Sequence, residues 1–216
     1  MRYLDLQRWP RRASYEHFRT FDDPYFNVCA RLDLSALVAL KPRLPGSLSL
    51  AYHHLVLRAA NELEPFRYRL HGEHVRVFDV VHGSTTVLRP DETITFAHLV
   101  YAADHAHFVA GALPRVRAAQ RGEVAFDPAL DEAALVHFTT LPWIDFTSFT
   151  HARDRSRPDG VPKVAFGRLV ESGGRHGMAI CVEVNHALMD GLHVGRLLQQ
   201  VQAWLDDPAP ALLGPA

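Results

Sequence analysis

The sequence is poor in the residues that would assign it to several functional classes. It has 216 residues, two cysteines (Cys29 and Cys181) and a formal net charge of −1 at pH 7. Two cysteines without metal-type spacing argue against a disulfide framework, so we expect a reduced thiol pair. A net charge near zero gives no electrostatic footprint for binding nucleic acid or an anionic membrane surface.

Long hydrophobic runs are missing as well. No apolar stretch reaches the length of a transmembrane helix, and residues 1–12 are polar, without the apolar core of a secretory signal. We therefore expect a soluble, cytoplasmic protein.

The signatures of several common enzymes are absent too. The chain has no Gly-x-Ser-x-Gly elbow, no phosphate-binding Walker loop and no dinucleotide fingerprint. Its 14 histidines include the groups His53-His54, His71-x-x-His74 and His105-x-His107. These groups lack a sustained helical His-x-x-x-His pair with a nearby carboxylate, and no cysteines accompany them, so no metal site is expected.

The pattern of apolar residues predicts one α/β domain spanning residues 1–216, without repeats or linkers. Pro114 is expected to kink or end a helix, residues 171–177 to form a loop, and the tail after Asp206 to fray. Helices are predicted at residues 14–19, 35–40, 48–63 and 103–121 and from Val194 onward. Strands are predicted at residues 25–34, 68–70, 75–77, 84–88, 93–99, 135–140, 164–170 and 178–184.

The most informative stretch is residues 178–204. Residues 178–184 read as a buried strand, and the apolar positions that follow Asp190 recur at helical spacing. Asp190 is suited to cap that helix, and His186 lies just after the strand, where a rigid scaffold can orient an imidazole. The spacing alone also fits a plainer interpretation, a strand end with one satisfied histidine.

Two motifs make this stretch more specific. Residues 185–191, Asn-His-Ala-Leu-Met-Asp-Gly, resemble the His-His-x-x-x-Asp-Gly signature of the chloramphenicol acetyltransferase family, with Asn185 in place of the first histidine. Residues 139–143, Thr-Thr-Leu-Pro-Trp, resemble the Ser-x-Leu-Pro-Trp block of the same family. Trp9 followed by a pair of arginines also matches, so the resemblance covers nearly the whole chain.

The resemblance implies roles for individual residues. His186 would be the general base, and Thr139 would supply the hydroxyl that stabilises the oxyanion. Asp190 would pair with Arg11 in a buried ion pair, and the family holds its catalytic imidazole by the histidine's own backbone carbonyl. Asn185 would support the same loop.

The resemblance also implies two binding regions. Trp143 and Arg168 would lie near the acyl donor. Two hydroxyls of the family's acceptor pocket are missing, because Phe18 replaces a tyrosine and Ala165 a threonine. The acceptor pocket would be lined by Phe18, Phe26, Phe96, Phe126, Phe149 and Ala165.

The resulting hypothesis is an acetyl-CoA-dependent O-acetyltransferase that acetylates the hydroxyl of chloramphenicol and so inactivates the antibiotic. The fold implied is that of the CoA-dependent acyltransferases, a mixed β-sheet flanked by helices, assembled as a homotrimer with active sites between subunits. Two alternatives stay open: the same transfer to another small alcohol or amine, and a catalytically silent trimer that only binds an acyl-CoA or another ligand.

Overall fold

The computed structural model describes residues 1–123, 126–127, 129–154 and 159–214. Its main feature is a six-stranded sheet of order β2-β9-β8-β7-β5-β6. The β5–β7 and β7–β8 pairs are parallel and the other three pairs are antiparallel, so the sheet is mixed, as the sequence analysis predicted. The strands are β2 (Tyr25–Asp33), β5 (His82–Leu88), β6 (Ile94–Leu99), β7 (Leu135–Thr140), β8 (Lys163–Ser172) and β9 (Arg175–Asn185).

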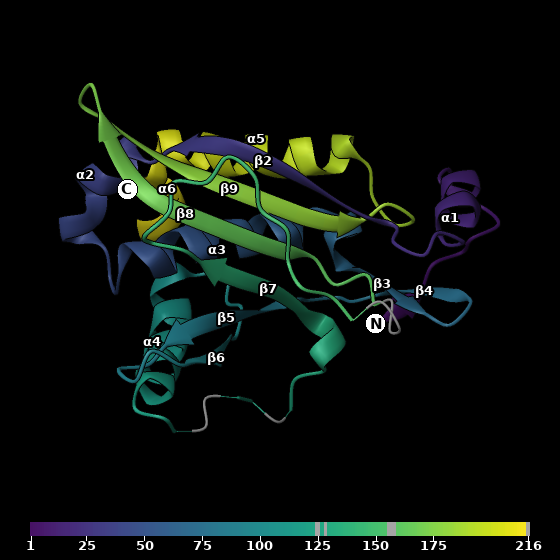
Figure 1. The fold of residues 1–216 in the computed structure, drawn as a ribbon, viewed down its shortest axis with the longest axis horizontal. Coiled ribbons are helices and arrows are strands. Elements are labelled where there is room, and N and C mark those ends of the chain that lie inside the picture. Colours follow the sequence, from purple (N-terminus) through teal and green to yellow (C-terminus); the bar gives the residue numbers. More distant parts are fainter. Residues whose placement is uncertain (124–125, 128, 155–158, 215–216) are drawn as a thin grey trace.

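Helices cover one face of this sheet (Figure 1). Side chains alternate between the two faces of a strand, and in β9 the residues Ile180, Val182 and Val184 are fully buried in the core that the helices complete. None of the helices in the described ranges is long and apolar enough to cross a membrane. The helices are α2 (Ser35–Leu40), α3 (Leu48–Glu62), α4 (His105–Gln120), α5 (Gly191–Asp206) and α6 (Pro208–Leu213).

The opposite face of the sheet is crossed by the β7–β8 connection, of which residues 141–154 and 159–162 are described (Figure 1). The Cys181 thiol donates to the carbonyl oxygen of Phe149 at 3.3 Å, and the backbone N–H of His151 donates to Glu183 at 3.2 Å. These bonds fix the connection over β9. The second face therefore carries polar contacts where the first carries the hydrophobic core.

A smaller three-stranded sheet of order β1-β4-β3 lies near helix α1 (Arg12–Phe18), at the right in Figure 1. Its strands are β1 (Arg2–Tyr3), β3 (Tyr68–His71) and β4 (His74–Val77), and the β3–β4 hairpin is the one that the sequence predicted. Short 3-10 turns lie at Lys41–Arg43, Glu64–Arg67 and Glu132–Ala134.

Three local expectations are decided by the structure. The tail does not fray after Asp206, because α6 places Leu212 in the core with only 3% of its surface exposed. Of the two outcomes expected at Pro114, an end of the helix is excluded, because α4 continues through this residue. The loop predicted at 171–177 shrinks to a turn at Gly173-Gly174, because both glycines adopt positive φ and let β8 and β9 pair almost to their tips.

Candidate active site

His186 follows directly after β9, in a tightly bonded turn. Its backbone N–H donates to the carbonyl oxygen of Pro24 at 2.7 Å, which ties the turn to the start of β2. The buried Asn185 side chain accepts a hydrogen bond from the N–H of Ala187 at 2.9 Å, and the Asn185 carbonyl accepts one from Leu188 at 3.0 Å. The backbone that carries His186 is therefore held from both sides.

Two aromatic rings fix the plane of the imidazole. The ring of Phe18, at the end of α1, lies almost parallel to that of His186, with 3.8 Å between centroids and 6° between planes. Phe26 of β2 contacts the same imidazole at 4.7 Å. Both phenylalanines were predicted to line the acceptor pocket, and both lie beside the predicted base. About a third of the His186 side chain, 34%, stays exposed to solvent.

Arg11 joins the N-terminal segment to this turn. Its Nε donates to Asp190 Oδ2 at 2.8 Å, while its Nη2 and Nη1 donate to the carbonyl oxygens of His186 at 3.1 Å and Ala187 at 3.3 Å. The expected pairing of Arg11 with Asp190 is present, but Asp190 is only partly buried, with 39% of its side chain exposed against 14% for Arg11. Burial raises the pKa of Asp190, but the bond and charge of Arg11 outweigh it and leave the pKa lowered.

The contacts of the imidazole differ from the family pattern in one respect. The backbone carbonyl of His186 accepts from Arg11, and the nearest acidic group to Nδ1 is Asp190, whose Oδ1 lies 3.5 Å away. A carboxylate at this distance attracts a protonated imidazole. The Asp190 carboxylate therefore lies near the imidazole as well as being paired with Arg11.

Asp190 also begins helix α5. Its backbone N–H donates to Nδ1 of His193 at 2.9 Å, a bond that requires His193 to be unprotonated at that nitrogen. Burial, followed by the charge of Arg11, lowers the pKa of His193 and agrees with this assignment. The carboxylate is then available to Arg11 and to His186.

Thr139 and Ala165 lie elsewhere in the same chain. Thr139 of β7 is opposite Ala165 of β8, which is opposite Cys181 of β9, five residues before His186. At about 3.3 Å per residue and about 4.8 Å per strand, Thr139 is roughly 15–20 Å from His186. One chain therefore does not bring the predicted base and the predicted hydroxyl donor together. Ala165 itself is fully buried.

The other predicted aromatics are also far from His186. Phe149 lies on the connection over β9, where it contacts His151 at 4.8 Å between centroids. Phe96, on β6 at the far edge of the sheet, and Phe126 are exposed by 46% and 48%. The predicted acceptor pocket is thus divided among three places in one chain.

The residues predicted for the donor side do lie close together. The backbone N–H of Arg168 donates to the carbonyl oxygen of Ile144 at 2.8 Å, directly beside Trp143 in the chain. Trp143 is 61% exposed and Arg168 is exposed as well. No group of three His, Cys, Asp or Glu side chains in the described ranges is arranged to hold a metal ion.

The sequence of this chain is similar to those of known acetyltransferases. The family description of chloramphenicol acetyltransferase matches residues 1–202, most of the chain and both motifs. The chain belongs to the chloramphenicol acetyltransferase family. The chloramphenicol acetyltransferase of Streptomyces acrimycini is 29% identical over 208 residues, covering 95% of this chain and 94% of its own length. That of Escherichia coli is 26% identical, covering 94% and 93%.

Solved structures share the fold of this family member. A chloramphenicol acetyltransferase aligns with a TM-score of 0.84 at 23% identity, covering 94% of this chain and 99% of that one. The dihydrolipoamide acetyltransferase of Azotobacter vinelandii aligns with a TM-score of 0.69 at 15% identity, covering 92% and 88%. These likenesses confirm the predicted fold, and family membership makes the chain an acetyltransferase.

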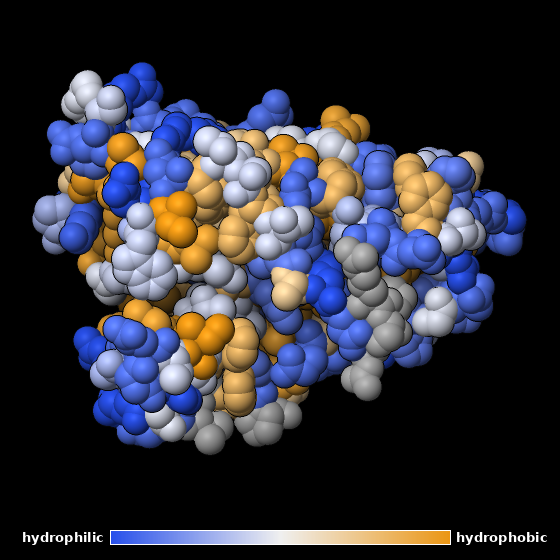
Figure 2. All heavy atoms as spheres, viewed as in Figure 1, coloured by the Kyte–Doolittle hydropathy of each residue, from blue (hydrophilic) through white to orange (hydrophobic). Residues whose placement is uncertain are grey.

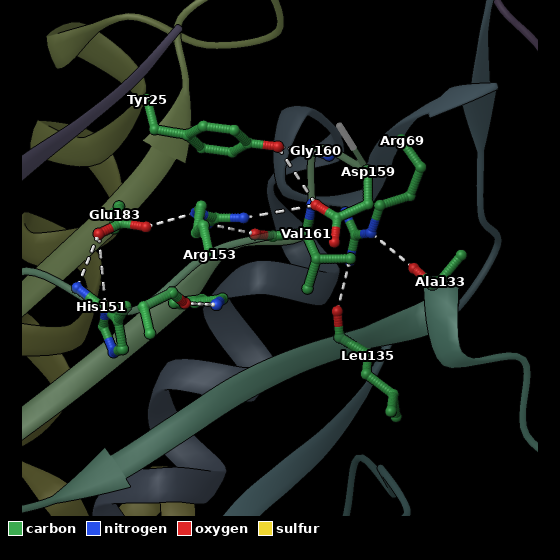
Figure 3. A network of polar contacts seen from close by, with 12 residues as sticks. Tyr25, Arg69, Ala133, Leu135, His151, Arg153, Asp159, Gly160, Val161 and Glu183 are labelled. Carbon is green, nitrogen blue, oxygen red and sulfur yellow. Dashed lines mark hydrogen bonds and ion pairs between the residues drawn. The ribbon is translucent and has the colours of Figure 1, made fainter. Parts of the chain in front are cut away.

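Sequence reasoning missed a buried ionic network on the face beneath the β7–β8 connection of this acetyltransferase (Figure 3). Arg153 and Glu183 are paired there with only 8% and 3% of their side chains exposed. Arg69 is fully buried and donates to backbone carbonyls, among them that of Leu135 at 2.8 Å. One signal was visible, since Glu183 is an acid within the otherwise apolar run 178–184.

Proposed function

We propose that the protein transfers the acetyl group of acetyl-CoA to a hydroxyl of a small acceptor, with His186 as the general base. Chloramphenicol is the acceptor that the family and the named relatives support, so the proposed biological role is inactivation of this antibiotic in the cytoplasm. The observation that carries the assignment is the fixed imidazole, since Phe18 sets its plane and Arg11 holds its loop.

The chemistry requires these groups. An alcohol is a poor nucleophile near neutral pH, so His186 takes its proton while the oxygen attacks the thioester carbonyl. The Thr139 hydroxyl would donate to the oxyanion that forms. As the carbon–sulfur bond breaks, the imidazolium returns the proton and free CoA thiol leaves. Asp190, 3.5 Å from Nδ1, would stabilise the imidazolium between the two proton transfers.

We further propose that the active unit is a homotrimer with sites between subunits. Within one chain, Thr139 and His186 are too far apart to act on the same carbonyl. A second copy can supply the missing partner, and its contact would cover the exposed rings of Phe96 and Phe126. Trp143 and Arg168 would then hold the CoA portion on the donor side.

A thiol-release assay tests the transfer. Purified protein is mixed with acetyl-CoA, with and without chloramphenicol, and free CoA thiol is followed with a thiol reagent. We expect release that depends on chloramphenicol, together with an acetylated product in the mass spectrum. Binding of acetyl-CoA without turnover on any hydroxyl acceptor would instead support the silent ligand-binding alternative.

Subunit mixing tests the location of the site. His186→Ala and Thr139→Ala are each expected to be inactive as pure proteins. If the site lies between copies, co-refolding the two variants creates some interfaces with both native residues and restores part of the activity. The control refolds each variant alone. A mixture no more active than its parents would place the site within one chain.

A further inference from the structure

A continuous row of polar side chains crosses the main sheet. One residue of each strand lies in this row, because the register pairs each member directly with the next. In strand order the row is Asn27 (β2), Glu183 (β9), Lys163 (β8), His137 (β7), Ser84 (β5) and His98 (β6). We call it the polar row.

The polar row faces away from the helices. Val182 and Val164, the neighbours of Glu183 and Lys163 in their strands, are buried in the helix-side core, so the polar residues point to the opposite face. Figure 2 shows this face of the molecule, where hydrophilic residues dominate toward the β3–β4 side.

The polar row runs beside the residues predicted to act on the substrate. His137 precedes Thr139 by two residues, and Lys163 precedes Ala165 by two. Residues two apart in a strand share a face and lie about 7 Å apart. A molecule whose reacting atoms lie at Thr139, and which extends along β7 toward its start, would have its next group over His137 and Lys163.

The acidic member of the polar row is already neutralised. Glu183 accepts from Nε of Arg153 at 2.5 Å, and the guanidinium of Arg153 stacks on the ring of Tyr25 at 3.7 Å (Figure 3). Burial raises the pKa of Glu183, but bonds from His151 and Arg153 outweigh it and hold the pKa at about 2. At neutral pH Glu183 is therefore ionised, and its carboxylate is paired with Arg153.

Lys163 has no such partner. Its Nζ donates to the carbonyl oxygen of Ala152 at 2.5 Å, and within the described residues no carboxylate oxygen lies within ion-pair distance of it. An ammonium has three N–H donors, so two remain for a ligand. Burial, followed by the charge of Arg153, lowers the pKa of Lys163, while the charges of Glu183 and Asp159 act in the opposite direction. The cation is therefore half-buried and lies near charges of both signs.

His137 completes the arrangement. Burial, with the charge of Lys163, lowers its pKa to about 4, so at neutral pH the imidazole is uncharged. A neutral imidazole can donate one hydrogen bond to an anion without adding a second positive charge next to Lys163. A half-buried cation beside a neutral donor is a suitable site for a carboxylate.

We propose that the preferred acceptor is a hydroxylated molecule that carries a carboxylate, bound by Lys163 with His137, next to the reaction centre at Thr139. The proposal rests on the acetyl transfer proposed above and defines its acceptor class. Neutral chloramphenicol would be accepted, but without an ion pair to Lys163. The chemistry of transfer is unchanged, because the carboxylate binds and does not react.

A matched pair of acceptors tests the proposal. In 4-(hydroxymethyl)benzoate a hydroxyl and a carboxylate stand at opposite ends of an aromatic ring, and in its methyl ester only the charge is missing. With the wild type, kcat/KM from thiol release should favour the acid over the ester by about tenfold to a hundredfold, as expected for a charged hydrogen bond. Lys163→Met should remove this preference, and Lys163→Arg should keep most of it.

The chain contains its own control. Lys41 is the other of its two lysines, it is exposed, and Lys41→Met should keep the wild-type ratio of acid to ester. If Lys163→Met does not fold, the proposal is tested by the ratio of kcat/KM for the acid to kcat/KM for the ester, measured with the wild type and with Lys163→Arg. A wild type that uses the ester as well as the acid overturns the proposal while leaving acetyl transfer intact.

A binding measurement separates the two hypotheses. Calorimetric titration with 4-(hydroxymethyl)benzoate should show binding that Lys163→Met weakens by at least the same factor and Lys41→Met does not change. If this holds but no acceptor releases thiol, the carboxylate site stands and the proposed transfer fails. If neither turnover nor binding depends on Lys163, the proposal is wrong.

Discussion

The ring of Phe18 lies flat against the imidazole of His186, with 3.8 Å between centroids. Phe18 ends helix α1, and Arg11, at the start of the same helix, pairs with Asp190 at the start of α5. Helix α1 therefore contacts the motif at both of its ends. One end fixes the plane of the imidazole, and the other fixes the backbone that carries it.

Removing the Phe18 ring should loosen the imidazole without removing it. We expect Phe18→Ala to lower kcat by about tenfold or more, since misplacement of a catalytic group has large effects on rate. KM for acetyl-CoA should change little. Phe18→Tyr keeps the stack and should keep most of kcat. An unchanged kcat in Phe18→Ala would show that the stack does not position the base.

His186→Ala tests the base directly. General-base catalysis typically contributes about 10²–10⁴-fold, so kcat should fall by at least this order. Circular dichroism and acetyl-CoA affinity should stay near wild type, because only a partly exposed ring is lost. His107→Ala, an exposed histidine on α4, is the matched control and should retain full activity. A His186→Ala protein with more than a tenth of wild-type activity would exclude this role.

Asp190→Asn should weaken both stability and catalysis, because it leaves Arg11 without its carboxylate. A fully buried pair would lose about 3–5 kcal/mol, and the partial exposure of Asp190 reduces the expected loss to about 1–3 kcal/mol. Asp22→Asn, at an exposed site, should cost little. Urea denaturation gives the free energy of unfolding of both variants.

The pH dependence of that loss has a definite sign. The folded-state pKa of Asp190 is lowered, so its stabilising contribution is present above the unfolded pKa of about 3.9 and disappears as pH falls through the folded value. The gap in unfolding free energy between wild type and Asp190→Asn should shrink as pH is lowered from 6 to 3. A constant gap would contradict the ion-pair explanation.

Glu183→Gln should destabilise the fold more than Asp190→Asn does. It leaves the Arg153 guanidinium without its carboxylate partner at a site where both side chains are almost fully buried. We expect a loss of about 3–5 kcal/mol in the free energy of unfolding. The pKa of Glu183 is lowered to about 2, so the wild type should keep this contribution down to about pH 4 and lose it below. Glu92→Gln, in an exposed turn, is the control, and equal losses in both variants would refute the argument.

The sequence by itself was enough for the order and type of most elements and for the family. Local signals decide these features: strand alternation at 178–184, helical spacing after Asp190, and turn residues between β3 and β4. The pairing of Arg11 with Asp190 was also predictable, because the resemblance to the family implies it. None of this depends on how distant strands align.

The features that depend on the register between strands could be found only in the tertiary structure. The polar row exists only because His137, Lys163 and Glu183 meet side by side, and a shift of one residue in any pair would turn a member into the core. The stack of Phe18 on His186, and the distance of Thr139 from both, likewise follow from how α1 and the strands pack. The sequence lists these residues far apart, and only the non-local pairing of the fold sets which of them share a face.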